Sequence, residues 1–468
     1  MPEPELTIAA IATPPGQGGI GVIRLSGSRA LPIAQALFRP TRAGVPLRSH
    51  RMVHGTLADP ATGAILDEAL VCLMRGPRSF TGEDVVEFHC HGSPVTLQRL
   101  LGCCLGLGAR LAERGEFTLR AFLNGRIDLA QAESVIDLVR ARTPTAAQVA
   151  AQGLTGALAK GLGPAVGALT GALAYLEATI DFVEEDLPEH AAPQLLATLG
   201  EAEDALTALL ARAGHGTLLR DGVRVVLAGK PNVGKSSLLN ALLRRDRAIV
   251  TPLPGTTRDT LEEAADIHGL PMFLIDTAGL AESEDLVERL GIARGTEALR
   301  HAAIVLLIVD GSRQPEDADR RAARAVRDVA PRTPLLLAMN KCDLPDGAAS
   351  GAYDALLDGA EPAAALVRCS AASGAGLSAL EDALADLALD GESLDAGSTL
   401  VENPRQRQAL EEAMAALAAA QIGLGAGHAS ELVCIDLRAA LEALGTVTGQ
   451  DVGEAVLDRL FGEFCIGK

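Results

Sequence analysis

The chain has 468 residues, a formal net charge of −19 at pH 7, no tryptophan and only 2% aromatic residues. Its length corresponds to about three domains. The negative charge excludes attraction of a nucleic acid by the overall field, and the scarcity of aromatics argues against a base-stacking platform. If RNA is the final substrate, a basic partner protein carries most of the contact; the alternative is that the acidity serves solubility alone.

Cysteine spacing and hydropathy indicate the compartment. None of the eight cysteines form a C-x-x-C pair, which argues against a zinc ribbon or a thioredoxin-like motif. The chain does not open on a basic and then apolar leader, and no apolar run approaches the roughly 20 residues of a membrane span. We therefore expect a soluble, cytoplasmic protein with reduced thiols and no membrane contact.

Residues 1–120 predict an α+β domain, in which helices separate short strands at 6–12, 21–25, 70–74 and 85–89. Gly16 to Gly21 match G-x-G-x-x-G, the pattern of a dinucleotide site. That site needs a helix after the glycines, whereas Gly21 leads into a predicted strand. We reject the dinucleotide site and expect these glycines to shape a bend.

The rest of the chain changes character twice. Residues 121–215 have helical periodicity, residues 216–388 alternate strands with helices as in a doubly wound sheet, and residues 389–468 are helical again. The C-terminal helices form a separate bundle, or they pack on the first helical part with the α/β domain inserted between. Each helical part looks thin alone, which favours insertion. The predicted fold class is a multidomain α/β and α protein.

Gly229 to Ser236 match G-x-x-x-x-G-K-S, the pattern of a phosphate-binding loop. An apolar run before it predicts a buried strand, and helical spacing follows it, which is the context that the motif requires. Backbone N–H groups of the loop and the helix N-terminus would face an anion. Lys235 would reach the β- and γ-phosphates, and the Ser236 hydroxyl would bind Mg²⁺. The residues expected to bind GTP here are Asn232, Val233, Gly234, Lys235, Ser236 and Ser237.

Asn340-Lys341-Cys342-Asp343 follows an apolar strand and selects the base. The Asp343 carboxylate can accept hydrogen bonds from N1–H and the exocyclic amine of guanine. Adenine has no donor at either place and would leave a buried charge unpaired. Ser370 and Ala371, after another strand, would close over the base. The motif predicts specificity for GTP over ATP.

Asp276-Thr277-Ala278-Gly279 ends a further predicted strand. Asp276 would hold Mg²⁺ through water, and the Gly279 N–H would sense the γ-phosphate. The preceding segment can complete the Mg²⁺ shell only while the γ-phosphate is present, which makes it a switch. Its expected GTP contacts are Thr251, Pro252, Leu253, Pro254, Gly255, Thr256 and Thr257, and those of the later motif are Asp276, Thr277, Ala278 and Gly279.

Leu280 stands where Ras-like enzymes often carry a glutamine that orients the attacking water. Leucine cannot do this, and no arginine finger is evident. Either hydrolysis is slow, or another group supplies the charge and positions the water.

The chain resembles the MnmE or TrmE family of tRNA-modifying GTPases over essentially its whole length. Besides the nucleotide motifs, the resemblance rests on segments 12–16, 80–85, 115–118, 121–124 and 128–133 and on the C-terminal Phe464-Cys465-Ile466-Gly467-Lys468. It implies a folate-binding-like N-terminal domain and a Ras-like GTPase domain inserted in a helical domain.

The resemblance also implies a potassium ion in place of an arginine finger. A monovalent cation beside the β/γ bridge neutralises developing charge, as a guanidinium would. The family's potassium ligands fall on Asn232, Thr251, Leu253 and Thr256, and Thr257 matches its Mg²⁺ threonine. The family's water-positioning glutamate falls on Glu288, a catalytic role that the residue pattern alone does not indicate.

In the N-terminal domain, the resemblance implies a bound tetrahydrofolate derivative (5-formyl- or methylene-tetrahydrofolate) and a homodimer. The family's folate contacts fall on Arg24, Glu87, Arg126 and Lys468. From the residues alone these would be ordinary surface ion pairs. Cys465 would take part in the modification chemistry; its alternative role is to anchor the tail on the helices.

The implied function is a GTPase that works with a flavin-binding partner of the MnmG family, in a heterotetramer or larger complex. Together they would add a carboxymethylaminomethyl or aminomethyl group to the wobble uridine of certain tRNAs, with the folate as one-carbon source. One alternative is a GTP-dependent ribosome-assembly factor, but the chain has no RNA-binding G-x-x-G loop in a basic context. The other is a scaffold that only senses GTP or folate.

Overall fold

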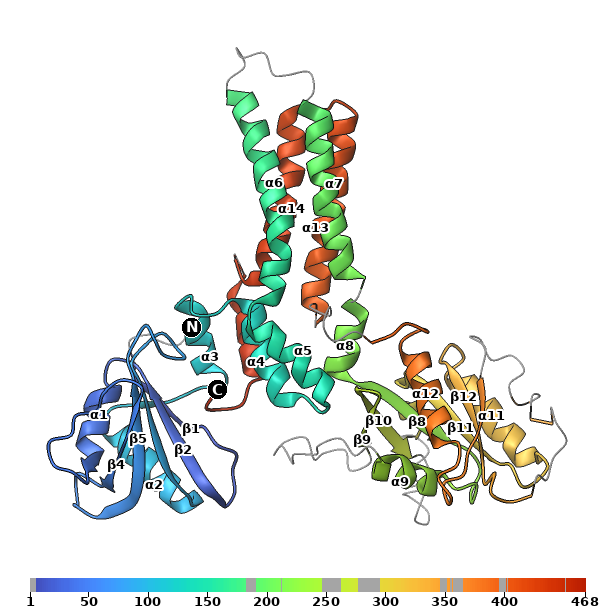
Figure 1. Cartoon of the computed structure of the whole chain (residues 1–468), viewed down its shortest axis with the longest axis horizontal. Coiled ribbons are helices and arrows are strands. Elements are labelled where there is room, and N and C mark those ends of the chain that lie inside the picture. The colour runs from blue at the N-terminus through green and yellow to red at the C-terminus, as the bar shows by residue number, and fades with distance from the viewer. Residues whose placement is uncertain are drawn as a thin grey trace. The chain divides into compact units, whose positions relative to one another are not determined.

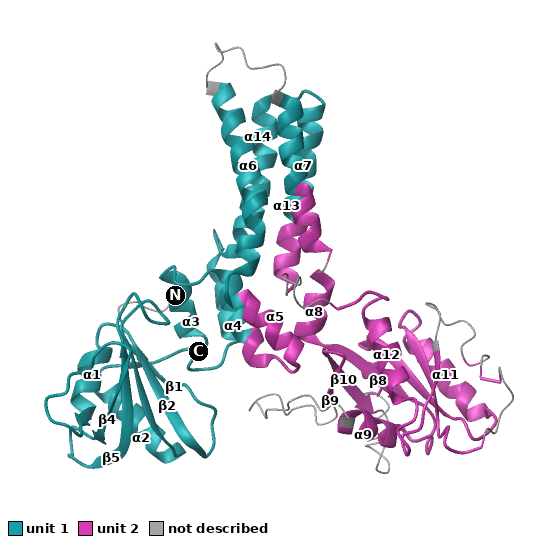
Figure 2. Ribbon diagram, in the orientation of Figure 1, with its two compact units in different colours: residues 1–136, 154–202, 412–468 teal, residues 137–153, 203–411 magenta. Residues whose placement is uncertain are grey.

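The computed structural model describes residues 6–181, 191–211, 213–245, 262–276, 295–345, 352–353, 356, 365–394, 401, 403–450 and 452–468. Packing divides the chain into two compact units, each built from segments far apart in sequence (Figure 2). Unit 1 comprises residues 1–136, 154–202 and 412–468, and unit 2 comprises residues 137–153 and 203–411. The four predicted segments are a different kind of division and stay a prediction.

Unit 1 begins with a seven-stranded sheet in the order β3-β4-β5-β6-β2-β1-β7. Its neighbours are antiparallel except β1 and β7. The strands are β1 (Ile8–Ile11), β2 (Gly18–Ser26), β3 (Phe38–Pro40), β4 (Arg51–Ala58), β5 (Ile65–Met74), β6 (Val85–Gly92) and β7 (Arg110–Leu111). The predicted bend is present, because the pairing of β2 with β6 shifts register between Gly18 and Gly21.

Helices cover this sheet unequally. The apolar sides of α1 (Ala30–Leu37) and α2 (Pro94–Gly106) bury Leu37 and Leu100 against Val71 and Phe88 on one face. On the other face, α3 (Glu116–Leu123) places Phe117 against Ile8 and Ala10 of β1. The predicted α+β arrangement is confirmed.

The remainder of unit 1 is helical, and two of its helices that pack together come from opposite halves of the sequence. Helix α6 (Ala157–Asp181) lies along α14 (Ser430–Thr448) in Figure 1, and Arg438 and Glu177 form an ion pair of 2.6 Å between them. The other helices with residues in this unit are α4 (Leu129–Arg140), α7 (Ala191–Leu210), α13 (Pro404–Gly425) and α15 (Glu454–Gly462). The two helical parts therefore join across the inserted α/β domain, as expected.

Helix α6 is also the one described helix that is long and apolar enough to cross a membrane, judged by length and composition alone. Its Leu158, Leu162, Leu169 and Leu176 recur at helical spacing and are buried. The same stripe that raises its hydropathy is therefore the stripe that packs within unit 1, as in the core helix of a bundle.

Unit 2 contains a six-stranded sheet in the order β13-β12-β11-β8-β10-β9, parallel except for the edge pair β9 and β10. The strands are β8 (Val223–Ala228), β9 (Glu262–Ile267), β10 (Leu270–Asp276), β11 (Ile304–Asp310), β12 (Leu335–Asn340) and β13 (Ala365–Arg368). Strands β8, β11 and β12 are mostly apolar because both faces of the sheet are covered; the exceptions are the exposed Arg224 and the strand-end residues Asp310 and Asn340. Those covers include α9 (Lys235–Arg245), α11 (Asp317–Val329) and α12 (Leu377–Ala388). The predicted doubly wound sheet is confirmed.

Residues 137–153 belong to the core of unit 2. Ala146 and Val149 of α5 (Pro144–Leu154) are buried with Leu219 of α8 (Ala213–Asp221) and with Ile267 and Leu270 of the edge hairpin. The Thr143 hydroxyl donates to the Gly269 carbonyl at 2.8 Å, in the turn between β9 and β10. The hairpin is therefore fastened to this helical segment.

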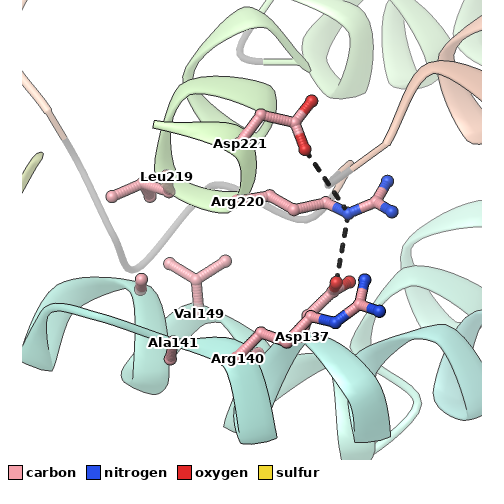
Figure 3. A pocket seen from close by; sticks show the side chains of 10 residues that line it. Asp137, Arg140, Ala141, Val149, Leu219, Arg220 and Asp221 are labelled. Carbon is pink, nitrogen blue, oxygen red and sulfur yellow. Dashed lines mark ion pairs between the residues drawn. The ribbon is translucent and has the colours of Figure 1, made fainter. Parts of the chain in front are cut away.

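A small cavity of about 80 Å³ lies between α8 and the segment around α5. Figure 3 shows Arg220 of α8 extending between Asp221 and Asp137, with Nε 3.1 Å from Asp137 Oδ1 and 3.8 Å from Asp221 Oδ1. The remaining wall carries apolar side chains such as Val149 and Leu219. This ion pair ties α8, which leads into β8, to residue 137.

Candidate active site

The phosphate-binding loop runs from the end of β8 to Lys235, the first residue of α9. Gly229 and Gly234 have φ values of +147° and +97°. A Cβ at Gly229 would lie 2.4 Å from the Ile308 carbonyl oxygen, and one at Gly234 would lie 2.3 Å from Asn340 Nδ2. Both positions require glycine, because a side chain would be strained and would clash.

The Lys235 ammonium is held inside this loop. Its Nζ donates to the carbonyl oxygens of Gly229 and Lys230 at 2.9 and 3.0 Å. Burial lowers the pKa of Lys235, and the charge of Asp276 opposes that effect. An ammonium has three N–H donors, so one is left for an anion in the loop.

Ser236 and Asp276 lie side by side, as the Mg²⁺ prediction requires. The Ser236 hydroxyl donates to Asp276 Oδ2 at 2.7 Å, and Asp276 is buried at the end of β10. A hydroxyl and a carboxylate are the hard oxygen donors that Mg²⁺ prefers, used directly or through water. The described donors therefore fit that metal.

The base-recognition residues are bonded to the phosphate-binding loop. Asn340 Nδ2 donates to the Val233 carbonyl at 2.9 Å, and Lys341 Nζ donates to the Asn232 carbonyl at 3.0 Å. Asn340 Oδ1 accepts from the Ala371 N–H at 3.0 Å. The two loops, more than a hundred residues apart in sequence, thus form one wall.

Asp343 lies beside Ser370, whose hydroxyl donates to Asp343 Oδ1 at 2.5 Å. Asp343 is exposed and Ser370 is buried. This bond gives Oδ1 a fixed position, and Asp343 lines a cavity. A cavity of about 590 Å³, within the range of ligand pockets, is lined by Gly234, Ser237, Asn240, Ala241, Arg244, Asn340, Lys341, Asp343, Leu344, Ser370, Ala371 and Ala372.

Sequence reasoning missed Asp310, which ends β11 and accepts from Lys341 Nζ at 2.6 Å. Burial alone raises the pKa of Asp310, but the hydrogen bonds from Lys341 and Ser312 outweigh it and the pKa is lowered. Its position at the carboxyl end of a predicted parallel strand was the available signal. Asp310 holds Lys341 against the phosphate-binding loop.

Several predicted residues lie outside the described part of the chain. These are Thr251, Pro252, Leu253, Pro254, Gly255, Thr256, Thr257, Thr277, Ala278, Gly279 and Glu288. Asn232, the remaining predicted potassium ligand, is described: it is exposed in the loop with φ +65°.

The predicted folate residues come together in part, in unit 1. Arg24 on β2 and Glu87 on β6 are opposite in register, and Arg24 Nε donates to Glu87 Oε1 at 2.8 Å. Arg24 also donates to the Gly467 carbonyl at 3.4 Å, which brings the C-terminal residues to the same place. Burial, and then the charge of Arg24, lower the pKa of Lys468. No hydrogen bond or ion pair joins the exposed Arg126 to these three in the described chain.

His89, Phe80 and Phe117 surround this pair and were not predicted. His89 Nε2 lies 3.2 Å from Glu87 Oε2, and the Arg24 guanidinium lies 5.6 Å from the Phe80 ring and 5.7 Å from the Phe117 ring. His89 and His91 both alternate with the buried Cys90 on β6, and His91 pairs with Asp67 instead of Glu87. Cys465 carries an exposed free thiol, and its backbone carbonyl accepts from the Lys468 N–H at 3.3 Å.

Comparison with known proteins assigns family models to both parts of the chain. The model of the GTP-binding protein TrmE N-terminus matches residues 7–126, and that of the MnmE helical domain matches residues 129–465. The chain is 50% identical to the tRNA modification GTPase MnmE of Chloroflexus aurantiacus, over 99% of each sequence. The same enzyme of Symbiobacterium thermophilum is 47% identical, over 99% of this chain and all of the relative.

Proposed function

Because this chain belongs to the MnmE family of tRNA modification GTPases, we propose that it modifies the wobble uridine of certain tRNAs together with an MnmG-family flavoprotein. GTP hydrolysis in tRNA modification follows from the family itself. The finer statement is that the complex adds a carboxymethylaminomethyl or aminomethyl group and takes its one-carbon unit from a tetrahydrofolate derivative. The observation that carries the GTPase part is the joining of the phosphate-binding loop, Ser236–Asp276 and Asn340 at one edge of a sheet.

In this proposal the described residues bind and orient the nucleotide. The N–H groups of residues 232–237 face the phosphates, and Lys235 uses its remaining donor on them. Ser236 and Asp276 would hold Mg²⁺, which supplies charge neutralisation at the β- and γ-phosphates when bound. Asp343 accepts from guanine, while Ser370 and Ala371 border the base. These parts position charge, which is the main catalytic requirement in phosphoryl transfer.

Activation by potassium is the second part of the proposal. Leu280 cannot orient water, so Asn232 with Thr251, Leu253 and Thr256 would hold the cation, and Glu288 would position the water. Asn232 supports this, because it lies exposed at a positive-φ position of the loop with its carbonyl already bonded to Lys341.

The potassium prediction is tested by GTP turnover in KCl and in NaCl at equal ionic strength. We expect turnover to be at least about tenfold faster in KCl, since a cation near the bridge acts as an arginine finger does. Asn232→Ala is expected to lose the difference between the salts while it keeps GTP binding. Equal rates of the wild-type protein in both salts would refute this part alone.

A homodimer formed by the N-terminal domain, with the folate at Arg24, Glu87, Arg126 and Lys468, is the third part. The ionic and aromatic surroundings of Arg24 support a site for an anionic, flat ligand. The sheet face away from α1 and α2 exposes Met52 and Leu70, which supports a second copy as its cover. We place the complex in the cytoplasm.

Nucleoside analysis of tRNA from cells that lack the gene tests the function as a whole. We expect the wobble modification to be lost and to return with the wild-type gene. Complementation with Cys465→Ser, whose thiol is exposed and makes no core contact of its own, tests the role of that residue separately. A wobble modification that persists at its wild-type level in the deletion strain would contradict the proposal. A ribosome-assembly defect in that strain, without loss of the modification, would favour the alternative factor.

A further inference from the structure

The second residue of the phosphate-binding loop is anchored to a helix that the GTPase motifs do not include. Lys230 Nζ donates to Glu316 Oε2 and to Asp319 Oδ2, both at 2.9 Å. Glu316 is the N-cap residue of α11, and Asp319 lies in its first turn. The Lys230 and Asp319 side chains are 14% and 3% exposed, so their bond is largely shielded from water, whereas Glu316 is 56% exposed.

Asp319 depends on this lysine. It is 3% exposed; its Oδ2 accepts from Lys230 and from the Glu316 N–H, and its Oδ1 has no hydrogen-bond partner in the described structure. A buried carboxylate in this state needs a cation nearby. Burial lowers the pKa of Lys230, but the bonds to Asp319 and Glu316 outweigh it and raise the pKa. The lysine therefore stays charged, and the pair holds the loop to α11.

The same residue touches the phosphate-binding lysine through its backbone. The Lys230 carbonyl accepts from Lys235 Nζ at 3.0 Å, next to the Gly229 carbonyl, which accepts from the same Nζ at 2.9 Å. We infer that Lys230 is a positioning residue for GTP binding and hydrolysis: its side chain, held by Glu316 and Asp319, fixes the carbonyl that aims Lys235 at the phosphates. This depends on GTP binding by the loop and on neither potassium nor tRNA chemistry.

The test compares Lys230→Met with wild type for the Kd of a fluorescent GDP analogue and for kcat and KM of GTP hydrolysis. We expect the Kd to rise about tenfold, since a charge-assisted hydrogen bond is lost. Lys230→Arg is expected to retain most of the affinity. Arg320→Met is the matched control, because Arg320 pairs with Asp317 on the exposed side of the same helix, and it should change neither constant.

A double-mutant cycle separates positioning from loss of fold. If Lys230 acts through Lys235, Lys230→Met has no further effect on the Kd in a Lys235→Ala background. An equal tenfold loss in both backgrounds, or a wild-type Kd in Lys230→Met, would overturn the inference. Should Lys230→Met fail to fold, Lys230→Met with Asp319→Asn removes both buried charges and is expected to show the same loss of affinity. Binding of the GDP analogue by the wild-type protein in the same assay tests the nucleotide site itself, separately from the role of Lys230.

Discussion

Two polar regions of the molecule use their charges in opposite ways. At the nucleotide-binding edge of unit 2, Lys235 keeps one donor free, and Asp343 is fixed through one oxygen only. In the N-terminal sheet domain, Arg120 donates to both Glu83 oxygens, to the Leu6 carbonyl and to Glu116. Unused hydrogen-bonding capacity marks a place for a ligand, and saturated capacity marks a structural network.

The largest expected effect comes from removing the carboxylate that is left open for the base. Asp343→Asn keeps the size of the side chain but places an NH2 donor, in place of one carboxylate oxygen, against the exocyclic amine of guanine. We expect GTP affinity to fall at least about a hundredfold, since two hydrogen-bond donors then face each other unpaired. Affinity for xanthosine triphosphate, whose base carries a carbonyl oxygen in place of that amine, should rise. Titration of both nucleotides measures this, and unchanged GTP affinity would contradict the guanine assignment.

The next effect tests the saturated network. Glu116 is 1% exposed and accepts from Arg110, Arg120 and the Glu113 N–H. Glu116→Gln leaves Arg120 with a weaker partner in the interior, so we expect the N-terminal domain to lose about 3 kcal/mol of unfolding free energy. Hydrogen exchange in residues 6–126 measures it. Glu113→Gln is the matched control, because Glu113 is 69% exposed, and an equal loss there would contradict a network role.

A smaller effect concerns the pH dependence of the same network. Burial raises the pKa of Glu116, but the bonds from Glu113, Arg110 and Arg120 outweigh it and lower the pKa below 4.5. A depressed folded-state pKa contributes stability above pH 4.5, and this contribution is lost as the pH falls through the folded-state value. Wild type should therefore lose stability more steeply below pH 4.5 than Glu116→Gln. If the unfolding free energies of wild type and Glu116→Gln fall in parallel with pH, Glu116 is not the cause of the acid sensitivity.

The smallest effect lies at the hairpin surface of unit 2. His268 Nε2 is 2.8 Å from Asp382 Oδ1, yet the two side chains are 50% and 62% exposed. Solvent screens such a pair, so His268→Ala should leave the melting temperature unchanged. Thermal unfolding measured with and without 1 M salt checks this. A clear fall in the melting temperature of His268→Ala would show that solvent exposure alone does not distinguish a weak surface ion pair from the ion pairs of the buried network.

The nucleotide edge could be predicted because its signals are local. Gly229, Lys235 and Asn340 stand in short motifs at the ends of apolar strands, and parallel strands bring those ends together. Their support could not be predicted in this way. Asp319 looks like an ordinary acidic residue in the sequence, and the strand-end position of Asp310 does not name its partner; only the fold brings them to Lys230 and Lys341.

The N-terminal pair shows the same limit more sharply. Arg24 and Glu87 are 63 residues apart on strands whose register no local pattern specifies, so only a family resemblance pointed to them. The helical periodicity of residues 137–153 agrees with α4 and α5, but an apolar helical face does not say which partner it packs against. Ala146 and Val149 pack in unit 2.

The β9–β10 hairpin connects the nucleotide edge to the helical segment that carries Thr143. Its two strands are paired without a break from Glu262 and Ile275 to Ile267 and Leu270, which stiffens the hairpin along its length. One end carries Asp276 beside Ser236, and the other is clamped by Thr143 at Gly269. A displacement of Asp276 along the strand would be transmitted to the turn at Gly269, where Thr143 is bonded. The two ends are about 20 Å apart at about 3.3 Å per residue. The hairpin thus offers a continuous hydrogen-bonded path from the nucleotide edge to the helical segment that carries Thr143.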